Sequence, residues 1–284
     1  MPANSPSPSV RAAATPKSLP PQPVDPFFPK PVQLQAIRRL VLDPGHGGDN
    51  LGAVGVLGVR EKALALDVAR RVAEYVRQHS SVEVVLTRDG DQSVPLRQRP
   101  RLANEFRGDA FISIHANAHE TSDAWGMEVF FLAAGSSIQA TRELIEREEG
   151  IEPAQPTAAL PWSIESIVAE MGHAAAHARS ESFAVALAAG LQKARPGVRF
   201  RGVRQAPFGV LKEARMPAVV LELGYLTHAA EGRALLDPAV HRQFGQAVLL
   251  GLVGLDRVLA ADRRPVTPAR AAAVGPGAHA GLAR

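Results

Sequence analysis

The chain has 284 residues, of which 46% are apolar and 21% are charged, so it can bury the core of one large domain or two small ones. Its formal net charge is +4, and lysine and arginine are scattered along it without a basic run, so no nucleic-acid partner is expected. Cysteine is absent, which excludes disulfides and thiolate metal sites and leaves histidine and carboxylate as metal ligands.

The two ends of the chain are expected to lie outside the folded part. Ten of the 23 prolines fall between Pro2 and Pro31, so residues 1–35 are predicted to form a Pro-rich disordered linker or arm. Residues 261–284 are predicted to be a disordered tail. No signal peptide is visible, and the longest uninterrupted apolar stretch, Ala247 to Leu255, is too short to span a bilayer, so no transmembrane segment is expected.

The first half of the folded part shows strands that alternate with helices. Strands are predicted at residues 37–43, 82–87, 109–118 and 126–132, and helices at 61–78 and 96–106. In the first helix, apolar residues recur every four positions from Leu64 to Val76, which is helical spacing. Pro100 must either kink the second helix or lie in its first turn.

An insertion at about residues 135–180 interrupts this alternation. Within it, residues 138–149 predict a charged, acid-rich helix, and a further helix begins at residues 164–171 and is completed by 182–194. Strands are then predicted at 198–203, 209–212 and 217–224, before a closing helix that Asp237 caps and Pro238 begins. These patterns predict an α/β fold, a mostly parallel twisted sheet flanked by helices, in one domain over residues 36–260.

Three predicted strands end near a side chain that can bind a metal or move a proton, namely His46, His115 and Glu222. Glu61 begins the helix that follows the first strand, so it should lie at the same edge of the sheet. Each residue alone has a structural explanation, such as an acid in the first turn of a helix or a buried core histidine. In open α/β sheets, however, ligands bind outside the carboxyl ends of the strands, and four such residues at one edge indicate an active site.

Two histidines and one carboxylate with an open fourth position match a catalytic zinc site. A zinc ion, Zn2+, at His46, Glu61 and His115 would lower the pKa of its bound water to about 7 and polarise a substrate carbonyl. Glu222 would then take the proton of the water and pass it to the leaving nitrogen. Glycines on both sides of His46 are expected to make room for the metal and the substrate.

Several stretches of the chain resemble one enzyme family. They are LDPGHGG (42–48), REKALALDVA (60–69), VVLTRDGD (84–91), DAFISIHANA (109–118) and APFGVLKEARMPAVVLELGYL (206–226). From about residue 38 to 258, the chain is similar to the zinc-dependent N-acetylmuramoyl-L-alanine amidases of the type-3 amidase family. The resemblance implies zinc ligands at His46, Glu61 and His115, with Glu222 as catalytic acid/base. It also implies the reaction, hydrolysis of the amide between N-acetylmuramic acid and L-alanine of the peptidoglycan stem peptide.

The insertion resembles the regulatory segment of the division-associated periplasmic amidases of Gram-negative bacteria. That resemblance implies a helix over the active site whose glutamate occupies the zinc until a protein activator displaces the helix. Glu148 is the candidate for this autoinhibitory glutamate, Glu146 and Glu149 are alternatives, and a solvated acidic helix is the structural explanation. The same resemblance implies peptidoglycan as the partner, a periplasmic location, and a role in cell-wall remodelling and daughter-cell separation.

Two other functions stay open at this stage. A zinc carboxypeptidase acting on stem peptides would need a positive group to hold a free carboxylate, and it would release a terminal amino acid. A silent peptidoglycan-binding module would bind no zinc and show no activity, and the presence of all four candidate residues argues against it.

One departure from the family pattern is Thr227-His228, where the family has Ser-Asn; it does not touch the proposed ligands.

Overall fold

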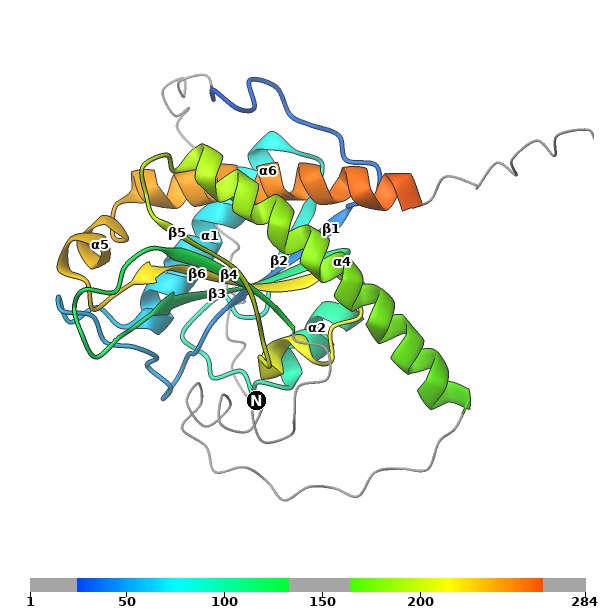
Figure 1. Ribbon diagram of the computed structural model, residues 1–284, viewed down its shortest axis with the longest axis horizontal. Helices are drawn as coiled ribbons and strands as arrows, with labels where there is room; N and C mark the ends of the chain where they lie inside the picture. The colour runs from blue at the N-terminus through cyan, green and yellow to red at the C-terminus, as the bar shows by residue number, and fades with distance from the viewer. Residues whose placement is uncertain (1–24, 133–163, 263–284) are drawn as a thin grey trace, which may run out of the picture.

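The computed structural model describes residues 25–132 and 164–262, which form a six-stranded sheet with helices on both faces (Figure 1). The strands are β1 (Arg39–Pro44), β2 (Glu83–Leu86), β3 (Ala110–Asn117), β4 (Met127–Leu132), β5 (Phe200–Ala206) and β6 (Ala218–Tyr225). The helices are α1 (Glu61–His79), α2 (Gln98–Glu105), α4 (Ile164–Ala194), α5 (Ala229–Ala234) and α6 (Pro238–Asp262), with a 3-10 helix η1 (Gly209–Leu211).

The sheet is mixed but mostly parallel, as the alternation of strands and helices predicted. Its strands lie in the order β2-β1-β3-β6-β4-β5, and every neighbouring pair runs parallel except β4 and β6, which are antiparallel. Because β4 and β5 run opposite to the other strands, their amino-terminal ends lie at the same edge as the carboxyl ends of β3 and β6. That edge therefore collects residues from the starts of two strands and the ends of the others.

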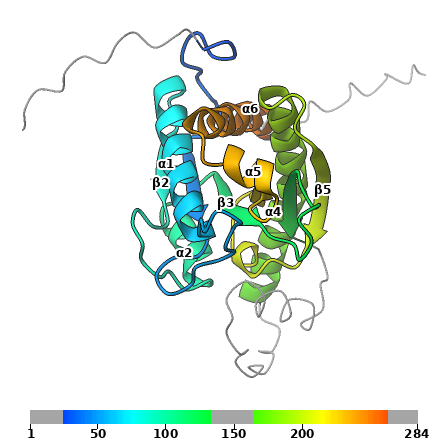
Figure 2. The same cartoon turned by 90° about the vertical axis from the view of Figure 1, so that its left-hand side faces the viewer.

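The sheet separates two apolar cores because successive residues of its strands point to opposite faces. In β1, Leu40 and Leu42 belong to the larger core, which α1, α4 and α6 cover. Val41 belongs to the smaller core, which α2 and η1 cover. Figure 2 shows α6 lying between α1 and α4 on the larger side.

The closing helix α6 is a core helix of the domain. Within the described residues, it is the one helix long and apolar enough to cross a membrane, and 61% of its most apolar window is buried inside the fold. It packs against α1 and α4, and at the crossing with α4 a Cβ on Gly190 would lie 2.3 Å from the carbonyl oxygen of Ala247. Only glycine at that position allows the two helices to approach so closely.

Two predicted elements have a different form in the structure. The strand predicted at 209–212 is wrong, because Val210 and Leu211 are both buried in the smaller core, which consecutive residues of a strand cannot be; the segment forms η1 instead. The two helical pieces predicted at 164–171 and 182–194 are one continuous helix, α4. Pro100 is the third residue of α2, so it lies in the first turn without a kink.

The short helix α5 was not predicted. Its N-cap is His228, whose Nδ1 accepts a hydrogen bond from the backbone N–H of Glu231 (3.1 Å). His228 belongs to the pair Thr227-His228, which stands where the resembled family has Ser-Asn, and here its imidazole caps the helix.

The expected amino-terminal arm ends earlier than residue 35. The carboxylate of Asp25 is buried and accepts hydrogen bonds from Gln246 (2.9 Å) and Arg242 (3.1 Å) of α6, and Val32 pairs with Ser80 at the end of α1. Residues 25–35 therefore pack on the domain. Three parts of the predictions lie outside the described residues: the rest of the predicted arm, residues 135–163 of the predicted insertion with its acidic helix, and all but the first two residues of the predicted tail.

Candidate metal centre

The turn after β1 holds His46 in a backbone conformation that favours glycine. β1 ends at Pro44, and the N–H of Gly45 still donates to the carbonyl oxygen of Ile114 in β3 (2.9 Å). His46 then has a φ of 57°, in the left-handed region, which costs about 1–3 kcal/mol for a residue with a side chain. Such a cost is tolerated where the surrounding structure fixes the residue for a purpose.

Two buried arginines fix this turn through its carbonyl oxygens. Arg88 donates to the carbonyls of Pro44 (3.0 Å) and Gly45 (2.7 Å). Arg99 donates to the carbonyls of Pro44 (2.7 Å) and His46 (2.7 Å). Hydrogen bonds from a charged donor are about twice as strong as neutral ones, so these contacts offset the strain at His46 and hold its side chain in place.

Glu61, the first residue of α1, faces both histidines. Its Oε1 atom lies 3.0 Å from Nε2 of His46 and 3.0 Å from Nδ1 of His115, and the same oxygen accepts the N–H of Ala116 (3.0 Å). Burial by itself would raise the pKa of Glu61, but hydrogen bonds and charge from His115 and His46 outweigh it and hold the pKa below its ordinary value. The group therefore contains a carboxylate that is ionised at neutral pH.

The structure brings His46, Glu61 and His115 together, all three buried, with one potential ligand atom of each within 4.8 Å of the others. Glycines make the close approach possible. A Cβ on Gly45 would lie 2.4 Å from Cε1 of His115, and a Cβ on Gly52 would lie 2.6 Å from Oε2 of Glu61. Gly45 and Gly52 thus make room for the ligand side chains themselves.

Asn50 determines which nitrogen of His46 faces the group. Oδ1 of Asn50 accepts the N–H of Gly52 (3.0 Å), so it is an acceptor, and Nδ1 of His46, also 3.0 Å away, must donate to it. With Nδ1 held by this hydrogen bond, the proton that His46 directs at Glu61 is the one on Nε2, and its loss leaves a lone pair there, 3.0 Å from Oε1 of Glu61. Two electron-rich atoms at this distance are stabilised by a cation between them, and an outer hydrogen bond of this kind is typical of metal-binding histidines. The donor set fits a bound metal ion.

Glu222 lies beside this group in the sheet. It is 5% exposed, and the parallel register of β3 and β6 pairs it with His115, so the two side chains lie on the same face. The fourth residue predicted from the sequence thus occupies the neighbouring position along the edge.

A second buried glutamate at this edge was missed by the sequence analysis. Glu128 of β4 is 2% exposed and lies opposite Glu222 in the antiparallel register. Its carboxylate accepts hydrogen bonds from the hydroxyl of Tyr225 (3.1 Å) and Nε of Arg201 (3.1 Å). The signal was present, because Glu128 interrupts an apolar strand in the way that Glu222 does. Asn50, Arg88 and Arg99 gave no such signal.

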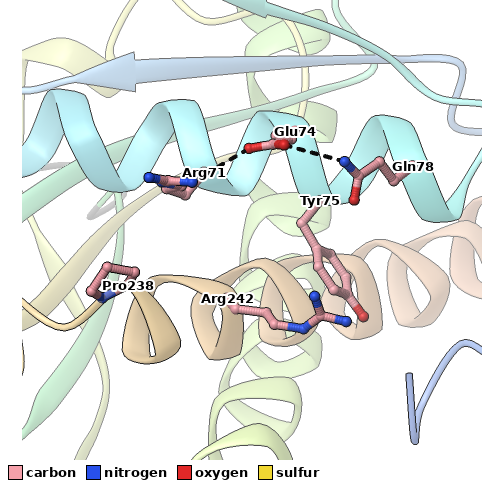
Figure 3. A pocket seen from close by; sticks show the side chains of 6 residues that line it. All are labelled: Arg71, Glu74, Tyr75, Gln78, Pro238 and Arg242. Carbon is pink, nitrogen blue, oxygen red and sulfur yellow. Dashed lines mark hydrogen bonds and ion pairs between the residues drawn. The ribbon is translucent and has the colours of Figure 1, made fainter. Parts of the chain in front are cut away.

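A groove on the helical side of the domain has different chemistry. Figure 3 shows that it lies between α1 and α6, where Arg71 and Gln78 both point at Glu74. Arg71 pairs with Glu74 at 3.8 Å, and Gln78 donates to it at 3.2 Å. Tyr75, Pro238 and Arg242 complete the lining. The groove begins ten residues after Glu61 on α1, about 15 Å along the helix, and contributes nothing to the metal centre.

The chain matches the model of one protein family. That family is described as N-acetylmuramoyl-L-alanine amidase, and the match covers residues 40–253, which include every strand but the first residue of β1. The chain is 30% identical over 233 residues to N-acetylmuramoyl-L-alanine amidase AmiA of Escherichia coli K12, with 79% of this chain and 78% of that protein covered. It is 29% identical to AmiC of another Escherichia coli strain, with 75% of this chain and 51% of that protein covered.

Solved structures agree with this match. The amidase AmiC2 of Nostoc punctiforme has a TM-score of 0.57 and 28% identity, with 76% of this chain and 95% of that chain covered. The catalytic domain of the amidase CwlV from Paenibacillus polymyxa has a TM-score of 0.53 and 28% identity, with 76% and 96% covered. The chain therefore belongs to the N-acetylmuramoyl-L-alanine amidase family and is an amide hydrolase of that class.

Proposed function

We propose that the chain hydrolyses the amide between N-acetylmuramic acid and L-alanine with one zinc ion held by His46, Glu61 and His115. The observation that carries this proposal is the buried group of two imidazoles and one carboxylate within 4.8 Å, with a carboxylate at the next position of the sheet edge. Three protein ligands of these types are what catalytic zinc uses, whereas magnesium and calcium prefer oxygen ligands alone.

In this proposal Glu222 is the catalytic acid/base. Bound zinc supplies a water of lowered pKa and a Lewis acid for the substrate carbonyl. Glu222 accepts the proton of the attacking water and delivers it to the nitrogen of the leaving alanine, since amide nitrogen leaves only when protonated. Asn50 keeps the proton of His46 on Nδ1, and Glu61, ionised at neutral pH, supplies the negative charge of the ligand set.

The surrounding assignments rest on the family and on the resemblance to division-associated amidases. The folded part, residues 25–132 and 164–262, is the catalytic domain. The substrate is peptidoglycan, which puts the working site outside the cytoplasm, in the periplasm, and the cellular role is cell-wall remodelling and daughter-cell separation. No nucleic-acid partner and no membrane-spanning role enter the proposal, in which α6 serves as a core helix.

The regulation of the site is a separate part of the proposal. Glu148 lies outside the described residues, in the insertion between β4 and α4, and we assign it as the glutamate that occupies the zinc until an activator protein displaces it. Replacing Glu148 with alanine is expected to raise the basal hydrolysis of dye-labelled sacculi in the absence of activator. If Glu148→Ala, Glu146→Ala and Glu149→Ala all have the basal activity of the wild type, none of these glutamates inhibits the enzyme. The acidic segment would then have no inhibitory role.

The direct test is digestion of purified sacculi by the wild type and by Glu222→Gln, each with and without a chelator. The wild type should release dye and free stem peptide, and the chelator should abolish the release until zinc is restored. Glu222→Gln should retain metal and lose at least about 100-fold in rate. Full activity of Glu222→Gln would overturn its catalytic role.

The products of the same digestion separate the remaining alternatives. Intact stem peptides with a new amino terminus at alanine identify an amidase, whereas release of a terminal amino acid identifies a carboxypeptidase. Absence of both products together with absence of bound zinc would identify a silent binding module.

A further inference from the structure

A row of residues continues from the metal centre across the sheet to its outer strand. In the strand register, His115 of β3 pairs with Glu222 of β6, Glu222 with Glu128 of β4, and Glu128 with Gly202 of β5. Directly paired residues place their side chains on the same face, and neighbouring strands are about 4.8 Å apart. The backbone of β5 therefore lies about 10 Å beyond Glu222, on the side opposite to His115.

A bulge in β5 turns an arginine toward this row. The register shifts between Met127, which pairs with Phe200, and Glu128, which pairs with Gly202, so Arg201 is the extra residue. Gly202 has a φ of 127°, which only glycine adopts readily. Gly202 pairs with Glu128, so in a regular strand the preceding residue, Arg201, would point to the opposite face of the sheet. The bulge lets the side chain of Arg201 reach Glu128, on the same face as Glu222.

Two arginines converge on Glu128 through the same kind of contact. Nε of Arg201 lies 3.1 Å from Oε1 of Glu128, and Nε of Arg204 lies 3.3 Å from the same oxygen. The hydroxyl of Tyr225 donates to Oε2, and the guanidinium of Arg201 lies over the ring of Tyr225 at 5.3 Å. Glu128 is thus a buried anchor that fixes the direction of both arginine side chains.

The anchor leaves the outer ends of both guanidinium groups for a ligand. Each arginine contacts Glu128 with Nε, and within residues 25–132 and 164–262 the terminal nitrogens of both make no hydrogen bond. The side chain of Arg201 is 23% exposed and that of Arg204 is 52% exposed, whereas that of Glu128 is 3% exposed. Two guanidinium groups share the single carboxylate of Glu128, so positive charge remains on their solvent-facing nitrogens for a ligand.

The distance from Glu222 to this charge fits the substrate of the family. A stem peptide that leaves the scissile amide along the row covers about 7 Å in two extended residues, which brings its second residue within reach of arginine side chains that extend from β5. The second residue of the stem is glutamate joined through its side-chain carboxyl, so its α-carboxylate is free. A carboxypeptidase substrate has its carboxylate on the residue next to the scissile bond. That carboxylate would lie near Glu222 and too far from Arg201 and Arg204 to contact them.

We propose that Arg201 and Arg204, held by Glu128, bind the free α-carboxylate of the second stem residue and so make the enzyme select acidic stems. This specificity rests on the proposed amidase reaction. Planar guanidinium groups recognise carboxylates through paired hydrogen bonds, and a site built for a carboxylate discriminates against its amide.

The test compares two glycan-linked stem peptides that are identical except that the second residue carries either a free α-carboxylate or a carboxamide. The wild type should cleave the carboxylate form with a kcat/KM about 10- to 100-fold higher. Arg204→Gln should raise KM for the carboxylate form more than for the carboxamide form and so remove most of this preference. Arg204→Lys should restore part of the preference, since it keeps the charge but not the planar geometry. Arg215→Gln, an exposed arginine before β6 at the other edge of the sheet, is the matched control and should keep it in full.

Arg204→Gln is the variant of choice because Arg201 continues to compensate the buried Glu128. Its thermal melting curve, compared with that of the wild type, checks that the fold is kept. Binding of the released peptides by calorimetry provides a measurement that needs no catalysis. Preferential binding of the acidic peptide by wild type, lost in Arg204→Gln, supports the proposal even if neither glycopeptide is cleaved, in which case the amidase reaction is what fails. Equal losses on the carboxylate and carboxamide forms, or equal binding of both peptides, would overturn the proposal.

Discussion

Glu61 at the sheet edge and Asp25 on the helical side are both buried carboxylates tied to distant parts of the chain. Asp25 accepts hydrogen bonds from the N–H groups of Phe27 and Phe28 and from side chains of α6, all of which are donors. Glu61 also accepts backbone N–H groups, but its other neighbours are the imidazoles of His46 and His115.

The difference between the two carboxylates shows what makes a buried charge a site. Around Asp25, donors and a guanidinium fully compensate the negative charge, so the contact fixes the chain and has no capacity for a ligand. Around Glu61, imidazole nitrogens can present lone pairs instead of protons, so the group reaches its most stable state when a cation joins it. A buried carboxylate surrounded only by hydrogen-bond donors has a structural role. A buried carboxylate surrounded by nitrogens that can offer lone pairs indicates a metal centre.

The largest expected effect comes from removing an imidazole. His115→Ala should lower hydrolysis of sacculi by more than about 1000-fold, because zinc would keep only two protein ligands. The measurement is initial rates with saturating zinc, and Arg215→Gln serves as the control away from the group. Activity within tenfold of wild type would show that His115 is not a ligand.

A smaller effect is expected from moving a ligand without removing it. Gly45→Ala should lower kcat by about 100-fold, because its Cβ would meet the ring of His115 at 2.4 Å and push it from its position. Gly197→Ala is the control for a glycine whose added Cβ meets no atom within 4 Å; its φ of 84° adds a backbone strain that Gly45→Ala does not have. Backbone strain should lower the stability of Gly197→Ala, but only Gly45→Ala should lose activity in the folded protein.

Removing the hydrogen bond behind a ligand should cost less again. Asn50→Ala should weaken zinc binding by about 10- to 100-fold, because Nδ1 of His46 loses the acceptor that keeps the lone pair on Nε2. Competition with a chromophoric chelator measures the affinity. An unchanged zinc affinity would show that Asn50 does not determine which nitrogen of His46 carries the proton.

The smallest effect on activity is expected on the helical side. Burial would raise the pKa of Asp25, but hydrogen bonds from Gln246 and from the N–H groups of Phe27 and Phe28 lower it to about 2, below its ordinary value of 3.8. The folded state therefore favours the ionised form, and this contribution to stability, roughly 2 kcal/mol, is complete above about pH 4 and is lost as the pH falls toward 2.

Asp25→Asn should accordingly lower the free energy of unfolding at pH 7 by roughly 2 kcal/mol and leave kcat for sacculi unchanged. Denaturant unfolding of both proteins at pH 7 and near pH 2 measures it, and the difference between them should shrink at the lower pH. A loss of kcat in the folded variant would show that the two carboxylates are not separate in function.

That the four candidate residues lie at one edge of the sheet could be predicted from the sequence, because each lies near the carboxyl end of a strand or at the start of the helix that follows it. His46 and His115 lie at strand ends, Glu61 opens a helix, and Glu222 interrupts a buried strand. The roles of Arg88 and Arg99 could not be predicted, since they bind backbone oxygens whose positions exist only in the fold.

The row of paired residues that ends at β5 could not be predicted from the sequence either. It depends on β4 running antiparallel to β6, and the alternation of strands and helices does not specify which strand is reversed. The reversal places Glu128 beside Glu222, and the bulge at Arg201 depends on a single positive φ at Gly202. The short helices η1 and α5 follow from local burial and capping that a periodic pattern does not reveal.

The central claim is that His46, Glu61 and His115 hold the metal while Glu222 acts beside it. The most direct test is the zinc content per chain, by mass spectrometry, of the wild type, Glu61→Gln and Glu222→Gln purified in parallel. We predict about one zinc in the wild type and in Glu222→Gln, and little or none in Glu61→Gln. Full zinc in Glu61→Gln, or loss of zinc in Glu222→Gln, would contradict this assignment of ligands and base.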